Sequence, residues 1–139
     1  MTTAIRQASC VAIEGRAVMI EGASGSGKSS LALALIDRGA VLIGDDGVAL
    51  ETHNGGIRAK APPNIGGKIE IRNVGIVELP TTEAPLALVL RLDRQAPRHV
   101  EQAESVELIG QKIPLIRLFP DSPQLHLRAE WALKLHGLD

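Results

Sequence analysis

Residues 22–29 read GASGSGKS and match the phosphate-binding pattern G-x-x-x-x-G-K-[ST] at every fixed position. The small residues let backbone N–H groups turn inward around phosphate oxygens, and the start of a following helix adds a partial positive charge. In this pattern Lys28 is expected to neutralise the β- and γ-phosphates of a nucleotide, and the Ser29 hydroxyl is expected to bind Mg²⁺. We therefore predict a nucleotide-binding loop made of Gly22, Ala23, Ser24, Gly25, Ser26, Gly27, Lys28, Ser29 and Ser30.

The segments on either side of this loop have the pattern that its chemistry requires. Ala17–Glu21 is an apolar run typical of a strand, and Ser29–Arg38 has apolar residues on one helical face, with Gly39 placed to end the helix. Upstream, Ala4–Ile13 is predicted to form a strand that returns through the turn at residues 14–16. The loop is therefore expected to join a strand to the first turn of a helix.

The rest of the chain is richer in strands than in helices. Ala40–Ile43 is consistent with a buried parallel strand, and the strands predicted at 48–52 and 57–61 form a hairpin through the turn at 53–56. We predict further strands at 69–72, 75–79, 86–92 and 113–118. Residues 94–110 are predicted as a loop with a short helix around 101–108, and a final helix is expected to end near His136. The expected fold class is α/β, a mixed sheet with few helices and considerable antiparallel content. With 139 residues, a single domain over positions 1–139 is expected.

Composition excludes several classes of function. The formal net charge is −1, and the chain has one Phe, one Trp and no Tyr, so neither a basic field nor an aromatic stacking surface for nucleic acid is expected. No apolar run is long enough for a membrane span, and no export signal is evident, so we expect no membrane partner and a cytoplasmic location. Cys10 is the only cysteine and is predicted to be a buried small residue.

Two positions offer a carboxylate for a metal ion at the end of an apolar strand. Asp45 and Asp46 follow the run at 40–43, and Asp93 follows the run at 86–92. Adjacent carboxylates near a triphosphate are unfavourable unless a cation or a shared proton relieves their repulsion. The presence of such a pair therefore favours a functional role for it. One can orient the metal or its water while the other accepts a hydroxyl proton as a general base. Asp93, with Arg91 before it and Arg94 after it, is predicted to form a surface ion pair or to end its strand.

Four segments together resemble the HPr kinase/phosphorylase family, specifically its catalytic C-terminal domain in the short form found in alphaproteobacteria. They are GASGSGKSS at 22–30, LALALIDRG at 31–39, VLIGDDGVAL at 41–50 and IEIRNVGIVEL at 69–79. The resemblance implies an ATP- and Mg²⁺-dependent kinase that phosphorylates a serine of the phosphocarrier protein HPr, in regulation of the phosphotransferase system. It also implies a homo-oligomer, which is commonly a hexamer in this family.

Carried over by position, the resemblance assigns roles to individual side chains. Lys28 and its loop would hold the phosphates, and Ser29 and Glu70 would ligate Mg²⁺. Asp46 would accept the proton of the incoming serine hydroxyl, and Asp45 would support Asp46 or the metal.

The chain departs from the family pattern at two places. Gln7 stands where the family has a histidine, and glutamine does not titrate near neutrality. The family's late arginine has no counterpart in the segment at 119–124, and Arg117 and Arg128 are out of register with it. We therefore expect kinase activity with weaker phosphorolysis. The alternatives are a nucleotide-binding regulator that has lost transfer activity and a small-molecule kinase that uses the same loop.

Overall fold

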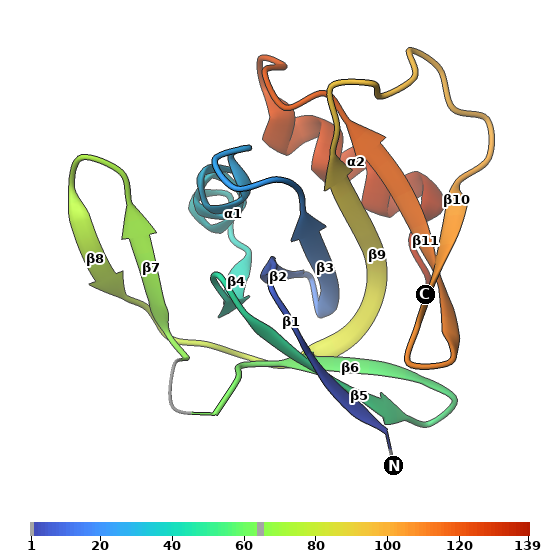
Figure 1. Cartoon of the computed structure of the whole chain (residues 1–139), viewed down its shortest axis with the longest axis horizontal. Coiled ribbons are helices and arrows are strands. Elements are labelled where there is room, and N and C mark those ends of the chain that lie inside the picture. The colour runs from blue at the N-terminus through green and yellow to red at the C-terminus, as the bar shows by residue number, and fades with distance from the viewer. Residues whose placement is uncertain (1, 64–65) are drawn as a thin grey trace.

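A computed structural model describes residues 2–63 and 66–139, and in that part the chain forms two helices and eleven strands (Figure 1). The helices are α1 (Lys28–Asp37) and α2 (Leu125–His136). The strands are β1 (Thr3–Arg6), β2 (Ser9–Ile13), β3 (Arg16–Glu21), β4 (Val41–Gly44), β5 (Val48–His53), β6 (Gly56–Lys60), β7 (Lys68–Ile71), β8 (Gly75–Glu78), β9 (Ala84–Leu92), β10 (Glu104–Leu108) and β11 (Gln111–Leu118). Neither helix is long and apolar enough to cross a membrane.

Nine of these strands form one curled sheet, and β7 pairs with β8 as a separate hairpin. The sheet order runs β1-β5-β6-β9-β3-β2-β4, with β11 also on β9 and β10 beyond it. Only the pairs β3–β9 and β9–β11 are parallel, and the remaining pairs are antiparallel. The predicted α/β class with a mixed sheet and few helices is therefore confirmed.

Strand β9 is the centre of the molecule and belongs to both halves of the sheet. Its first residues pair antiparallel with β6, whereas Leu86–Arg91 pair parallel with β3. The strand therefore bends between the two halves, as the long curved ribbon in Figure 1 shows. Its apolar run is buried on both faces, which explains why the run is continuous and does not alternate with polar residues.

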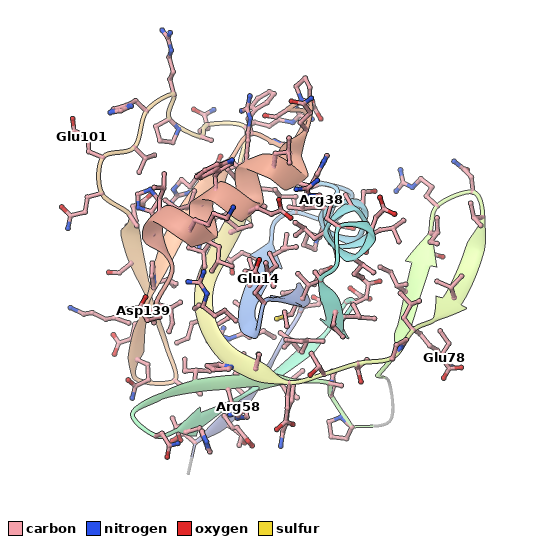
Figure 2. The ribbon with its side chains drawn as sticks, turned by 180° about the vertical axis from the view of Figure 1, so that it is seen from behind. Glu14, Arg38, Arg58, Glu78, Glu101 and Asp139 are labelled. Carbon is pink, nitrogen blue, oxygen red and sulfur yellow. The ribbon has the colours of Figure 1, made fainter. Side chains whose placement is uncertain are left out.

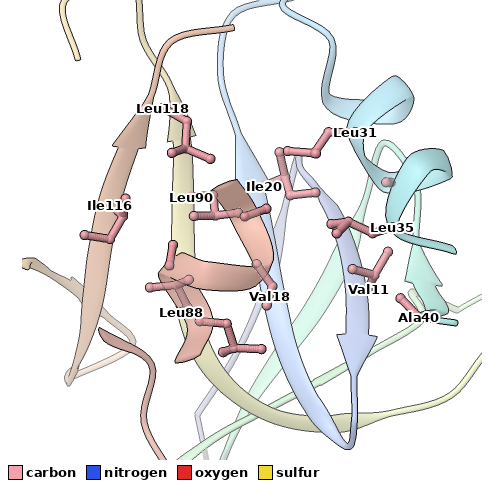
Figure 3. Packing of buried hydrophobic residues seen from close by; sticks show 14 of the residues in the cluster. Val11, Val18, Ile20, Leu31, Leu35, Ala40, Leu88, Leu90, Ile116 and Leu118 are labelled. Carbon is pink, nitrogen blue, oxygen red and sulfur yellow. The ribbon is translucent and has the colours of Figure 1, made fainter. Parts of the chain in front are cut away.

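The core has one apolar cluster on each side of β3 and β9. One lies beneath the helices, where Leu31 and Leu35 of α1 pack beside Val11, Val18 and Ile20 (Figure 3). The other lies between these strands and the β5–β6 layer, and it includes Cys10. Burial raises the pKa of the Cys10 thiol, so this residue is a neutral core side chain, as predicted.

Charged side chains lie around the outside of this core, as the residues labelled in Figure 2 show. Arg38, which follows α1, donates from Nε to both carboxylate oxygens of Glu130 on α2, at 3.0 and 2.9 Å. The two helices that cover one face of the sheet are thus joined by an ion pair at their outer side. Water screens exposed pairs of this kind, so their contribution to stability is small.

The turns of two hairpins were predicted correctly from the residues within them. Glu14 and Gly15 join β2 to β3, and Asn54 and Gly55 join β5 to β6, with φ between +50° and +81° at all four residues. This backbone conformation matches the twist of paired strands and suits Gly and Asn. Both predicted hairpins are confirmed.

Three predicted elements differ from the structure. The strand predicted over 4–13 breaks at residues 7–8, because β1 pairs with β5 whereas β2 pairs with β3 and β4. The run at 40–43 forms β4, which pairs along its length antiparallel to β2, and its one parallel contact is an isolated bridge from Leu42 to Thr81. The helix predicted around 101–108 is wrong, since residues 104–108 form β10 against β11.

Candidate active site

The phosphate-binding loop lies at the carboxyl end of β3, beside the parallel strand β9, and leads directly into α1. Gly25 and Gly27 have φ of +79° and +104°, values that L side chains rarely adopt. The Ser26 amide donates to the Ala23 carbonyl at 3.0 Å, which closes the loop into a tight turn. With helix α1 beginning at Lys28, its unpaired N–H groups and positive dipole end face the same space.

Lys28 is folded back onto this loop. Its ammonium donates to the carbonyl oxygens of Gly22 and Ala23, at 3.0 and 3.1 Å. These contacts hold the charge at the mouth of the loop, where a phosphate oxygen would compete for it. The hydroxyl of Ser26 is buried inside the loop and has no hydrogen-bond partner among the described residues. A buried donor without a partner is costly, so this loop carries an unsatisfied polar group in its interior.

The carboxylate pair reaches the loop from β4. Asp45 Oδ1 accepts hydrogen bonds from Ser29 Oγ at 2.7 Å and from Ser9 Oγ at 2.9 Å. This places one carboxylate directly against the Ser29 hydroxyl, which the loop pattern predicts to bind Mg²⁺. Asp46 follows in the turn with φ +60° and an exposed side chain, a conformation that Asp and Asn tolerate better than other L residues.

The β7–β8 hairpin forms the opposite wall. Ile69 is buried in the core cluster below the helices, so the neighbouring positions Lys68 and Glu70 face outward. The hairpin is also joined to β4, because the Thr82 amide that follows it donates to the Leu42 carbonyl at 3.0 Å. The wall that carries Glu70 is therefore attached to the strand that carries the carboxylate pair.

These elements enclose a cavity of about 680 Å³. Its lining holds three acidic and three basic side chains, namely Asp45, Asp46, Glu70, Lys28, Lys68 and Arg72, together with Ser9, Ser24, Gly25, Gly27, Ser29, Ser30 and Ile76. Of the predicted loop residues, Gly22, Ala23 and Ser26 lie behind this lining and shape the loop. The predicted base, metal ligands and phosphate-binding residues thus share one cavity.

The donor set fits a magnesium ion that is held jointly with phosphates. Over residues 2–63 and 66–139, no three His, Cys, Asp or Glu side chains gather closely enough to hold a metal by themselves. Mg²⁺ usually binds one or two protein oxygens and takes its remaining ligands from substrate phosphates and water. The Ser29 hydroxyl and the carboxylates of Asp45 and Glu70 are oxygen donors of that kind.

Asp93, the alternative metal site, lies outside the cavity lining. Its carboxylate accepts from the Gln95 amide and from Arg117, both at 2.8 Å, and these contacts hold its pKa below the usual range. Arg117 also lowers the pKa of Glu104, to which it donates at 2.8 Å. Asp93 therefore forms the expected ion pair, although the partner is Arg117 and not the neighbouring arginines of the sequence.

Sequence reasoning missed four residues of the lining: Ser9, Lys68, Arg72 and Ile76. Lys68 carries a signal that was available, because it lies two residues before Glu70 on the same face of a strand. Ser9 has no such signal in the sequence, because it lies 36 residues from Asp45, its partner in the site. Gln7, at the position where the resemblance expects a histidine, is exposed and does not line the cavity.

The two arginines near the family's late arginine do not line the cavity either. Arg117 is held by Asp93 and Glu104, and Arg128 on α2 donates to Ser122 Oγ at 3.0 Å. The cations that do face the cavity are Lys28 from the loop and two from the hairpin.

Comparisons with known proteins identify relatives of this chain. A curated HPr kinase/phosphorylase of Clostridium novyi is 40% identical over 70 residues, covering 50% of this chain and 23% of its own. That of Brevibacillus brevis is 32% identical over 118 residues, covering 75% of this chain and 38% of its own. The chain therefore spans less than two fifths of the length of these relatives.

A solved structure gives the same result for the fold. The structure of the Hpr(Ser) kinase/phosphatase from Coxiella burnetii matches 94% of this chain and 88% of its own, with a TM-score of 0.83 and 27% identity. The family model of the HPr Serine kinase C-terminal domain matches residues 2–83, which include the phosphate-binding loop, the carboxylate pair and Glu70. The chain belongs to the HPr serine kinase C-terminal domain family.

Proposed function

We propose that this chain is an ATP- and Mg²⁺-dependent serine kinase whose acceptor is the phosphocarrier protein HPr. The observation that carries the proposal is the hydrogen bond from Ser29 Oγ to Asp45 Oδ1 within the cavity that also holds Lys28, Asp46 and Glu70. A phosphate cradle, oxygen donors for a metal and a free carboxylate base are the parts that phosphoryl transfer to a hydroxyl requires.

Binding of ATP begins with the loop. Backbone N–H groups around Gly25 and Gly27 take the phosphate oxygens, and Lys28 exchanges its two carbonyl acceptors for the β- and γ-phosphates. Ser29 and Glu70 would hold Mg²⁺, with Asp45 fixing Ser29. The ion, when bound, neutralises charge that develops on the phosphates.

Transfer then requires a base for the acceptor. Asp46 lies in an exposed turn at the edge of the cavity, where a serine brought in by a partner protein can approach it. The serine oxygen attacks the γ-phosphorus, its proton passes to the Asp46 carboxylate, and ADP leaves from the opposite side. Positioning and charge neutralisation supply most of the rate enhancement in such reactions.

The proposed site favours phosphorylation of HPr over phosphorolysis of phosphoserine-HPr. Phosphorolysis must bring inorganic phosphate beside an already anionic phosphoserine, and a cation at that point offsets the repulsion. Arg117 and Arg128 are engaged elsewhere, and Gln7 lies away from the lining. We expect release of pyrophosphate from phosphoserine-HPr and inorganic phosphate to be slower than phosphorylation of HPr by ATP.

The test is transfer of label from γ-³²P-ATP, with Mg²⁺, to purified HPr. Label should appear on HPr and be absent from an HPr in which the acceptor serine is alanine. Asp46→Asn is the matched variant of this chain, because Asn accepts the same positive φ but cannot take the proton. It should bind ATP normally and lose transfer. Transfer by Asp46→Asn at the rate of the unaltered chain would overturn the role of Asp46.

The second candidate, a nucleotide-binding regulator without transfer activity, is favoured by one observation. Among the described residues of the cavity lining there is no histidine, the side chain whose ordinary pKa lies near neutrality. Saturable binding of Mg-ATP together with no labelled HPr would support the regulator and contradict the kinase.

A further inference from the structure

We propose that Ser9 is a positioning residue of the metal side of this cavity: its hydroxyl holds the Asp45 carboxylate, which in turn sets the direction of the Ser29 hydroxyl. The inference rests on the proposed function, since it concerns the same metal–nucleotide site. It assigns a role to a side chain 36 residues from Asp45 in sequence.

Ser9 is in an unusual place for a polar side chain. It is the first residue of β2, it pairs with Ile20 on β3, and only 1% of its surface is exposed. The remaining side chains with so little exposure in residues 2–63 and 66–139 are apolar. Burial of a hydroxyl is costly unless it has a partner, and the partner here is a carboxylate at the wall of the cavity.

The sheet is irregular at the point where Ser9 faces Asp45. Strands β2 and β4 pair at Cys10 and Gly44, and their register shifts between Cys10 and Val11. Such irregularities redirect side chains and are common next to functional sites. The shift lets the residue before Cys10 meet the residue after Gly44, which is how Ser9 and Asp45 come together.

In both hydrogen bonds of Asp45 the carboxylate is the acceptor. Ser9 and Ser29 both donate to Asp45 Oδ1, at 2.9 and 2.7 Å. A serine hydroxyl has a single proton and two lone pairs, so the proton that Ser29 gives to Asp45 leaves only lone pairs to face the phosphate cradle. That is the orientation a metal ligand needs. The terminal torsion of an aspartate is broad, and the bond from Ser9 removes that freedom.

The same segment carries Gln7, at the position where the resemblance expects a titrating histidine. Gln7 is exposed and lies away from the lining, whereas Ser9 lies in it. In this chain residues 7–9 therefore reach the site through the hydroxyl of Ser9 at the start of β2, and their contribution is to hold the Asp45 carboxylate in place.

The test compares two substitutions at one position. Ser9→Ala removes the hydroxyl, and Ser9→Thr keeps it on a residue that strands favour. Mn²⁺ affinity is measured in the presence of ADP by electron paramagnetic resonance of the free ion, and ADP affinity without metal is measured by calorimetry. We expect Ser9→Ala to weaken Mn²⁺ binding by about 10-fold, the lower end of the loss that follows removal of a direct partner of a metal ligand, because Ser9 acts on Ser29 through Asp45. ADP affinity without metal should stay within about twofold, and Ser9→Thr should bind Mn²⁺ like the unaltered chain.

Val11→Ala is the control in the same strand. Val11 is fully buried in the apolar cluster below the helices, so this change lowers stability without touching Asp45. It should leave Mn²⁺ affinity unchanged. If Ser9→Ala does not fold, Ser9→Cys replaces it, because sulfur fills the space but is a weak donor, and the same loss is expected.

The outcomes separate this inference from the proposed function. Normal Mn²⁺ affinity in Ser9→Ala, an equal loss in Ser9→Thr, or an equal loss of metal-free ADP binding would each overturn the role of Ser9. No Mn²⁺–ADP binding by the unaltered chain would contradict the proposed function itself. If the Ser9 variants change Mn²⁺ affinity as expected but the unaltered chain transfers no phosphate to HPr, the kinase function is rejected and Ser9 remains a positioning residue.

Discussion

A methyl group at Gly44 has no room in the turn that carries Asp45 and Asp46. An ideal Cβ built on Gly44 would lie far inside 3.0 Å of the Gly47 carbonyl oxygen, a separation that real Cβ atoms essentially never show. The obstacle is backbone, so no side chain can rotate away. To bring the pair to ordinary contact at 3.4 Å, the turn must move by about 1.3 Å.

The expected result of Gly44→Ala follows from that displacement. Overpacking of this kind lowers the free energy of unfolding by about 1–3 kcal/mol, which a urea titration measures. A misplacement of about 1 Å at a reacting group costs about 100-fold in rate, so phosphorylation of HPr should fall by that factor. Mn²⁺ affinity in the presence of ADP should fall with it, because Asp45 would leave the 2.7 Å contact with Ser29.

Gly56→Ala is the matched control, because it adds the same methyl group in the β5–β6 hairpin, where the nearest atom is 3.8 Å away. It should change stability by less than about 0.5 kcal/mol and leave activity unchanged. A folded Gly44→Ala with normal Mn²⁺ affinity and normal transfer would refute the reasoning, since the turn would then tolerate a displaced carboxylate pair.

Lys28→Ala should show no detectable ATP binding by calorimetry at concentrations that saturate the unaltered chain, because the loop loses its only side-chain cation; normal affinity would contradict the site. Leu35→Ala, at a position with no exposed surface in the core below α1, should lower the free energy of unfolding by about 3 kcal/mol through cavity formation, and a loss below about 1 kcal/mol would show that α1 packs differently. Arg117→Gln tests the ion pairs of Asp93 and Glu104, whose pKa values are held low in the folded chain. Their contribution to stability is present above about pH 5 and is lost as pH falls through the lowered values, so urea titrations of the variant should show a shallower loss on acidification, and an identical pH profile would reject these pairs as the cause.

The parts of the fold that sequence predicted are those with local causes. Small residues and Lys28 predict the phosphate-binding loop. Residues that accept positive φ predict the turns at 14–15 and 54–55. The apolar run at 86–92 predicted a strand, and it forms most of β9. In each case the interactions that select the structure are within a few residues.

The parts that sequence did not predict depend on pairings across the chain. β10 forms because β11 offers it an edge, and the sequence at 101–108 has no strong preference of its own. The contact of Ser9 with Asp45 requires the order β3-β2-β4 and the register shift at Cys10. The lining residues Arg72 and Ile76 can be identified only once the hairpin is placed against α1 and the loop.

The bond from the Thr82 amide to the Leu42 carbonyl has a dynamic consequence. It makes the β7–β8 hairpin and β4 one cooperative unit for local opening, because the hairpin cannot swing outward without releasing the edge of the strand that leads to Asp45. A nucleotide bound between the loop and Glu70 would suppress that opening at both ends. Slower hydrogen exchange at Thr82 would then report occupancy of the site from outside it.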